Sequence, residues 1–369
     1  MDGDIILVIV VATALAFDFT NGFHDTANAV ATSISTRALA PRTAVTLASL
    51  LNFAGAFVSL KVAATIASGI VDAKVVTTTV IFAGLIGAIF WNLLTWYFGL
   101  PSSSSHALIG GVVGAAFAAA GAGAVKSAGL LEKVIVPALV APVLAFLAAG
   151  MAILMAYRMV GHMRPGPVNR GYRYGQIASL SLLSLSHGTN DAQKTMGIIT
   201  LALIANGSLT GVNPDPPTWV IVSAASAIAL GTYSGGWRII RTMGSRIIKM
   251  DPAQGFSAQT GGAAVILTAA HLGFPLSTTH SITGAVLGAG AAKRVSAVRW
   301  GLAGNIFLAW VLTLPCAALV GGLTYGVTRI FGTGALGPVL VSVALLALMA
   351  VVLGKRLQRG PALTTAVES

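Results

Sequence analysis

Two short polar segments, Pro101-Ser-Ser-Ser-Ser-His106 and Pro275-Leu-Ser-Thr-Thr-His280, interrupt long apolar regions of this sequence. The apolar regions lie near 77–124 and 257–292, and each has room for two helices. At membrane depth, a broken helix is stable only where protein or a water-filled cavity surrounds its free backbone groups. We therefore expect each region to form a re-entrant helical hairpin whose polar tip lies inside the protein.

The composition of the chain is that of an integral membrane protein. Of its 369 residues, 56% are hydrophobic and 9% are charged, and the mean hydropathy is +0.86. Soluble domains carry about 25% charged residues, so this chain has too little polar surface for a soluble body of its size. The formal net charge of +12 gathers in short stretches between apolar segments, which indicates the positive-inside rule rather than nucleic-acid binding.

Further apolar runs are long enough to span a bilayer, which takes about 20 residues. They lie near 5–33, 43–68, 133–159, 176–206, 217–236, 300–327 and 336–354. Basic clusters in 158–175, 237–256 and 293–299 mark the cytoplasmic side. We expect a multi-pass protein of the plasma (inner) membrane, and the side assignments agree with one another if each hairpin enters and leaves on one side. Its N-terminus is then outside, and its C-terminus, with Lys355 and Arg359, is cytoplasmic.

Two sets of residues recur in the same order in both halves of the chain. The first set matches in spacing and consists of Asn21, Gly22, His24, Asp25 and Asn28 in the first half and His187, Gly188, Asn190, Asp191 and Lys194 in the second. The second set matches in residue type and consists of Pro101, Ser103, His106, Gly110 and Gly114 in the first half and Pro275, Ser277, His280, Gly284 and Gly288 in the second. Inverted repeats with discontinuous helices at the midplane are typical of secondary transporters. We predict an all-α integral membrane fold, built as an inverted-topology repeat with two re-entrant hairpins. Its parts are a first repeat over 1–160, a basic cytoplasmic loop over 161–175, a second repeat over 176–330, and an extra transmembrane helix with a C-terminal tail over 331–369.

Each half carries an aspartate, Asp25 or Asp191, inside an apolar segment. A carboxylate at that depth costs about 2.5–3.5 kcal/mol on insertion scales. The aspartates can simply bond neighbouring helices, but a cation bound between them accounts better for their paired positions. Carboxylate and amide oxygens suit Na+, and carboxylate or imidazole suits a proton. We expect the cation-coupling residues to be Asn21, His24, Asp25, Asn190 and Asp191, with Asp25 and Asp191 as metal ligands if the ion is Na+, and we expect no cofactor.

The hairpin tips are suited to an oxyanion. Hydroxyls, free N–H groups and the helix dipole at a helix N-terminus all favour negative charge. N-capping by Ser105 or Thr279 needs one hydroxyl per tip, whereas the tips carry three or four hydroxyl residues in a row. Lys194 lies on the same helix face as Asp191, where it either neutralises that carboxylate or approaches the anion.

The segments Asn21-Gly-Phe-His-Asp-Thr-Ala-Asn28 and His187-Gly-Thr-Asn-Asp-Ala-Gln-Lys194, with the two hairpin tips, resemble the inorganic phosphate transporter (PiT) family over nearly the whole chain. The resemblance implies cation-driven phosphate uptake and a phosphate site between the aspartate motifs and the hairpin tips. The expected phosphate-binding residues are Asn28, Ser103, Ser104, Ser105, Gln193, Ser277, Thr278 and Thr279. Many sodium-coupled members carry Asn at the position of His24, so the chain looks more like the bacterial low-affinity, proton-coupled branch, which moves phosphate with a divalent metal.

Three alternatives to a phosphate symporter stay open from the sequence. Sulfate permeases share this fold, so the substrate can be another tetrahedral oxyanion. A passive anion channel is a second alternative, although the deep carboxylates favour ion coupling. An intramembrane hydrolase is the third, but the polar residues come in symmetric pairs, which catalysis does not require. Besides phosphate and the lipid bilayer, a homo-oligomeric partner is also left open.

Overall fold

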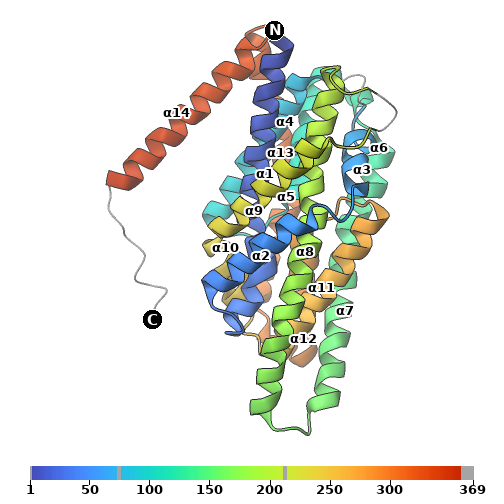
Figure 1. Cartoon of the computed structure of the whole chain (residues 1–369), viewed down its shortest axis with the longest axis vertical. Helices are drawn as coiled ribbons and strands as arrows, with labels where there is room; N and C mark the ends of the chain where they lie inside the picture. Colours follow the sequence, from blue (N-terminus) through green and yellow to red (C-terminus); the bar gives the residue numbers. More distant parts are fainter. Residues whose placement is uncertain (1, 73–75, 211–213, 359–369) are drawn as a thin grey trace.

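The computed structural model describes residues 2–72, 76–210 and 214–358, which form a bundle of helices (Figure 1). The first half contains α1 (Asp2–Ser35), α2 (Pro41–Gly55), α3 (Lys61–Gly69), α4 (Thr78–Phe98), α5 (Ser104–Ala120), α6 (Ser127–Leu130) and α7 (Val136–Val160). The second half contains α8 (Pro165–Ala205), α9 (Thr218–Ser234), α10 (Trp237–Arg241), α11 (Pro252–Leu272), α12 (Thr278–Lys293) and α13 (Trp300–Ile330), followed by α14 (Leu336–Gln358).

Among the described residues, four helical stretches are long and apolar enough to cross a bilayer. They are α1, α4, α13 and the stretch Ser127–Val160, which joins α6 to α7 through a π-helical turn. The bent pair of α9 and residues 237–246, with an angle of 59° at the break, is a fifth span if the two helices are counted as one. These lengths and compositions are those of a multi-pass membrane protein.

Both expected hairpins are present, as α4–α5 and α11–α12. The first helix of each hairpin ends at a glycine with left-handed backbone, Gly99 (φ 66°) or Gly273 (φ 78°). Two residues later comes Pro101 or Pro275, which cannot continue a helix. The same Gly-x-Pro pattern therefore breaks both hairpins at the same place.

The second helix of each hairpin is capped by Ser103 or Ser277. Their side-chain oxygens accept hydrogen bonds from the backbone N–H groups three residues later, at 3.1 and 3.2 Å. The expectation that Ser105 or Thr279 caps these helices is wrong. The backbone is still extended at Ser103 and Ser277 and becomes helical directly after them, so the cap falls two residues earlier.

The two halves run in opposite directions and interleave. In Figure 1, α1 begins at the top and α8 at the bottom. α1 packs against α9 and α8 against α2, while the hairpin α4–α5 packs against α13 and the hairpin α11–α12 against α7. Each hairpin is thus held by the last helix of the other half, and the two motif helices α1 and α8 lie side by side between them.

Equivalent glycines make these crossings possible. A Cβ atom on Gly22 would lie 2.3 Å from a backbone carbonyl of α9, and one on Gly188 would lie 2.1 Å from a backbone carbonyl of α2. The same holds at the hairpins, where a Cβ on Gly114 or Gly288 would lie 2.0 or 2.1 Å from a carbonyl of α13 or α7. Such distances exclude any side chain, so close backbone contact explains these repeated glycines.

Two predicted segments differ in the structure. The apolar run 43–68 is broken after Gly55 into α2 and α3 rather than forming one helix. The expected loop 161–175 is a turn at 161–163, and α8 then begins at Pro165, eleven residues before the predicted span. Proline is favoured in the first turn of a helix, because it supplies a fixed φ and lacks an N–H group that would be unpaired there.

The C-terminal region 331–369 contains α14, which extends away from the bundle in Figure 1 and contacts α1 and α13. The expected tail from 359 to 369, including Arg359, lies outside the described residues.

Candidate ion and oxyanion site

The two motif aspartates meet at the centre of the bundle. Asp25 on α1 and Asp191 on α8 are 2% and 0% exposed. His187 lies between them, with Nε2 2.8 Å from Asp191 Oδ2 and 4.0 Å from Asp25 Oδ2. The structure therefore brings the predicted pair together and adds an imidazole that bridges them.

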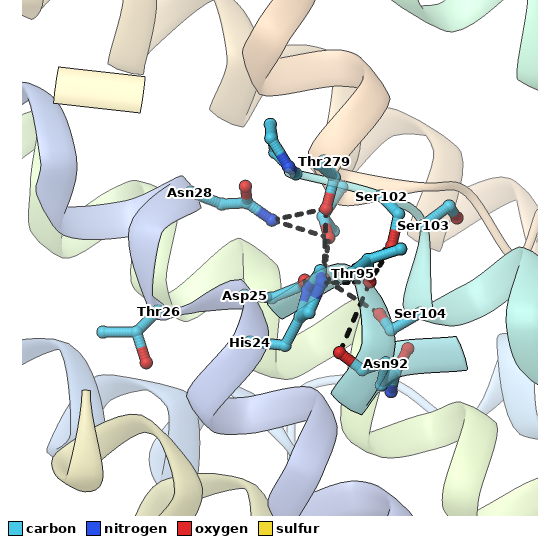
Figure 2. A network of polar contacts seen from close by, with 12 residues as sticks. His24, Asp25, Thr26, Asn28, Asn92, Thr95, Ser102, Ser103, Ser104 and Thr279 are labelled. Atoms are coloured by element: carbon cyan, nitrogen blue, oxygen red, sulfur yellow. Dashed lines mark hydrogen bonds and ion pairs between the residues drawn. The ribbon is translucent and has the colours of Figure 1, made fainter. Parts of the chain in front are cut away.

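His24 belongs to the same centre (Figure 2). Its Nδ1 lies 2.5 Å from Asp25 Oδ1, and its Nε2 lies 3.1 Å from Thr95 Oγ1. Thr95 in turn shares a 2.8 Å hydrogen bond with Ser102 at the first hairpin tip. The His24 ring thus connects the Asp25 carboxylate to α4 and to the polar break behind it.

Each hairpin tip donates one hydroxyl to the aspartate of its own half, and Thr278 and Thr279 of the second tip also donate to Asp25 Oδ2, at 3.4 and 3.3 Å. Ser104 Oγ donates to Asp25 Oδ2 at 2.9 Å, and Thr278 Oγ1 donates to Asp191 Oδ2 at 2.9 Å. Ser104 and Thr278 are equivalent, since both lie three residues after the proline of their tip. The inverted repeat therefore reproduces this contact in both halves with the same geometry.

The next hydroxyl of each tip contacts the last residue of the opposite motif. Thr279 Oγ1 accepts a hydrogen bond from Asn28 Nδ2 at 2.9 Å, as Figure 2 shows. Ser105 Oγ accepts one from Lys194 Nζ at 2.5 Å. With Ser104 and Thr278, these contacts place four of the six predicted tip residues at the aspartates. The other two, Ser103 and Ser277, use their side-chain oxygens as helix caps.

Gln193 is not part of this cluster. Its Oε1 accepts hydrogen bonds from the backbone N–H groups of Val62 and Ala63, at 2.8 and 3.2 Å, and its Nε2 donates to the carbonyl of Thr189. These contacts cap the N-terminus of α3, so Gln193 stabilises the break between α2 and α3. Gln193 is adjacent to Lys194 in sequence, but it does not lie on the face of α8 that carries Asp191 and Lys194.

The predicted amides Asn21 and Asn190 are buried but lie outside the hydrogen-bonded cluster. Among the described residues, Asn21 Oδ1 and both side-chain polar atoms of Asn190 have no hydrogen-bond partner. Asn21 lies beside Asp18, which also faces Thr195 on α8 and is fully buried. α1 and α8 therefore carry a second polar group, next to the aspartate centre, with oxygens available to a cation.

Asp25, His187 and Asp191 can hold a metal ion, because one ligand atom from each lies within 4.8 Å of the others. Carboxylate and imidazole groups are ligands for divalent transition metals and zinc. His187 is absent from the residues predicted for the site, although it was visible in the motif. Its signal is the spacing: it lies four residues before Asp191, one helical turn away, at the position that Asn21 has in the first half.

The fold and the site together define a membrane transporter. The two halves are inverted and interleave, each contains a broken hairpin, and ionisable side chains are buried where the halves meet. The model of the phosphate transporter family matches residues 21–321, and the chain belongs to that family. As a member of a transporter family it is not an enzyme, so the hydrolase alternative is wrong.

Similar proteins agree with this assignment. The chain is 55% identical to a probable low-affinity inorganic phosphate transporter of Mycobacterium bovis over 96% of its own length and 85% of the relative's. It is 52% identical to a protein of the same description from Rhizobium meliloti, over 87% of this chain and 96% of that protein. A solved structure described as the sodium-dependent phosphate transporter matches with a TM-score of 0.82 and 25% identity, covering 88% of this chain and 99% of the other. The predicted family and the predicted all-helical membrane fold are confirmed.

Proposed function

We propose that this protein imports inorganic phosphate by symport with a cation, and that the cation is a proton. Membership of the phosphate transporter family and the description of the relatives support the substrate. The proposed phosphate site lies between the two hairpin tips and the motif helices. Donors there are the Asn28 amide on α1 and four hydroxyl residues at the starts of α5 and α12, which are Ser104, Ser105, Thr278 and Thr279. Free N–H groups and the helix dipoles at these starts favour an anion.

The main support for cation coupling is that the aspartates accept hydrogen bonds from the hairpin hydroxyls. Ser104 and Thr278 donate to Asp25 and Asp191, so in this state the best donors for phosphate are already occupied. Phosphate also meets two carboxylates, and like charges about 4 Å apart repel by about 4 kcal/mol at an effective dielectric constant near 20. A cation or proton on the carboxylates removes the repulsion and frees the hydroxyls. Phosphate and the coupling cation therefore bind together.

His24 supports the proton as the coupling ion. Its ring contacts Asp25 at 2.5 Å, and imidazole is the side chain that gains or loses a proton near neutral pH. The similar sodium-dependent transporter supports the competing assignment to Na+. Asp25, His187 and Asp191 together suit a divalent metal that enters with phosphate as cargo.

Uptake of labelled phosphate by purified protein in liposomes tests this proposal, with H+ and Na+ gradients imposed separately. We expect accumulation under an inward H+ gradient, collapse of accumulation by an uncoupler, and weak competition by sulfate. Accumulation that follows the Na+ gradient and ignores pH would overturn the proton assignment. Equal competition by sulfate would overturn phosphate selectivity, and uptake that never exceeds equilibrium would indicate a channel.

We also propose that the N-terminus is outside and that the hairpin α4–α5 opens outward and the hairpin α11–α12 inward. The basic residues near Lys249 and Lys293, at the open end of the second hairpin, support this orientation. After removal of Cys316, single cysteines at the exposed positions Ala122 and Ser296 report the two open ends. An impermeant thiol reagent should label A122C from outside and S296C from inside. Labelling of both from the same side would contradict the proposed orientation.

A further inference from the structure

The two motif helices make matching contacts through their aspartates but differ three residues later, where α1 carries Asn28 and α8 carries Lys194. Both side chains reach the hairpin of the opposite half, through Thr279 and Ser105 respectively. One position of the repeat is thus a neutral amide in the first half and an ammonium group in the second.

Lys194 is 1% exposed, and all three of its ammonium protons have oxygen partners. Nζ donates to Asp191 Oδ1, to Ser105 Oγ at 2.5 Å and to the carbonyl of Leu276 at 2.8 Å. The oxygens come from α8, from the start of α5 and from the break between α11 and α12. A carboxylate, a hydroxyl and a backbone carbonyl from separate elements form the ligand set that proteins use to hold a hard cation.

The equivalent position in the first half supplies no charge to its aspartate. Asn28 Nδ2 donates to Thr279 at 2.9 Å and to Thr278 at 3.5 Å, so this neutral amide reaches Asp25 only through two hydroxyls, which donate to Asp25 Oδ2. Besides the hydroxyls that donate to Asp25, its neighbours are the imidazole rings of His24, at 2.5 Å, and His187, at 4.0 Å. Asp191 is therefore paired with an ammonium group of the chain, whereas no lysine or arginine among the described residues forms an ion pair with Asp25.

We propose that the Lys194 ammonium is a tethered cation that fills the ion position of the second half, so that only the Asp25 half takes up a mobile coupling cation. This inference rests on the proposed cation-coupled transport and adds which half of the repeat performs the coupling. It follows that the transporter carries one cation fewer per phosphate than a protein with an amide at both positions.

Replacing Lys194 with Asn gives the second half the residue of the first and tests the proposal directly. Lys194→Asn should create a requirement for Na+ or Li+ that the wild type lacks, with uptake on the order of tenfold higher in Na+ than in choline, a usual size for coupling between two sites. Na+ should also raise the Tm of Lys194→Asn above that of the same variant in choline, because an ion that binds only the folded state stabilises it. Lys194→Arg retains the charge and should acquire neither response, and Lys249→Asn on the exposed surface is the matched control.

Three results would overturn the proposal. The first is that Lys194→Asn folds and shows no Na+ or Li+ response in either uptake or Tm beyond that of the wild type. The second is that Lys194→Asn and Lys194→Gln fail to fold in Na+ as well as in choline, since a mobile cation should then restore the missing charge. The third is that Lys194→Arg gains the same cation requirement. Each variant is compared with the wild type, so failure of the proposed function can be told apart from failure of this inference. A wild-type protein that uses Na+, or that moves no phosphate, refutes the proposed function, but it produces none of the three differences between variant and wild type.

Discussion

The two motif helices, α1 and α8, hold equivalent aspartates in different electrostatic surroundings. Both aspartates accept a 2.9 Å hydrogen bond from the equivalent hydroxyl of a hairpin tip. Their histidines, however, come from different positions, His24 directly before Asp25 and His187 one turn before Asp191. Lys194 pairs with Asp191 alone. The comparison shows that the repeat fixes the place of the carboxylates, while single residues around each one decide what charge it keeps.

The largest effect is expected from removing either carboxylate. Asp25→Asn should abolish accumulation, because a neutral side chain cannot attract the coupling cation or release it. Asp191→Asn should abolish it as well, because Lys194 then keeps its charge at the site without the carboxylate that balances it. The two variants should differ in stability. Asp191→Asn leaves the buried Lys194 charge unpaired, at a cost of about 3–5 kcal/mol, whereas Asp25→Asn leaves no fixed cation behind.

Liposome uptake and thermal denaturation in detergent measure these two effects, with Asp215→Asn on the exposed surface as a control. Near-normal accumulation in both variants would show that the aspartates only join helices. Equal loss of Tm would remove the electrostatic difference between the halves.

The second prediction concerns coupling rather than binding. His24→Asn gives the first motif the residue that the second carries at Asn190, and it removes the imidazole ring beside Asp25. Uptake by this variant should lose its dependence on an imposed pH gradient. The exposed His162 provides a matched His→Asn control. If pH-driven accumulation persists in His24→Asn, then His24 serves only to position Asp25.

Hydroxyl removal at the hairpin tips should change affinity by a smaller amount. Ser104→Ala and Thr278→Ala each remove one donor, at about 1–3 kcal/mol, which corresponds to a half-saturation concentration higher by about 5–150-fold. Equal shifts in the two variants would support a phosphate held symmetrically between the tips. The exposed Thr268→Ala is the control.

The capping serines should behave differently from the donors. Ser103→Ala and Ser277→Ala remove caps of α5 and α12, so each should cost about 1 kcal/mol of stability. Initial uptake rates over a range of phosphate concentrations separate the two roles. A rise in half-saturation as large as that of Ser104→Ala would place the caps in direct contact with phosphate.

The smallest effect is expected at the open end of the second hairpin. Asp251 caps α11, accepts hydrogen bonds from the Gln254 backbone N–H at 2.9 Å and from the Tyr157 hydroxyl at 2.8 Å, and pairs with Lys293 at 2.9 Å. Partial burial alone would raise the pKa of Asp251, but the Gln254 N–H, Lys293 and Tyr157 outweigh it and lower this pKa below its usual value. The first hairpin has an uncharged cap at Thr77 instead.

Folding lowers the pKa of Asp251, so its negative charge stabilises the folded protein at pH values above the pKa of the unfolded chain, about 3.9. This stabilisation is lost as the pH falls through the lower pKa of the folded state. Asp251→Asn retains capping ability and should lower stability by less than about 1 kcal/mol at neutral pH, since Lys293 is exposed. The Tm difference from wild type should vanish in acid. If the Tm of Asp251→Asn differs from that of the wild type by the same amount at neutral and at acidic pH, the effect comes from capping alone.

Much of the fold and half of the site follow from the pattern of residues. The two polar breaks, each a proline followed by hydroxyl residues, predict both hairpins, and the aspartates at equivalent spacing predict a shared centre. Gln193 shows the limit of such reasoning. Gln193 is adjacent to Lys194, but consecutive residues of a helix point about 100° apart. Its side-chain amide therefore contacts the N-terminus of α3 instead of the site. The break between α2 and α3 was equally hidden, because an apolar run does not reveal where the backbone bends.

The sequence by itself determined that the chain spans a membrane, repeats in inverted order and buries two carboxylates, because hydropathy, charge placement and spacing are local properties. Only the tertiary structure decided which groups surround each carboxylate. His187 reaches both aspartates, and Lys194 reaches Ser105 and Leu276, because the hairpins interleave with helices of the opposite half. Contacts between residues 82 to 162 positions apart depend on helix packing through close-fitting glycines such as Gly22 and Gly188, and no local pattern specifies that packing.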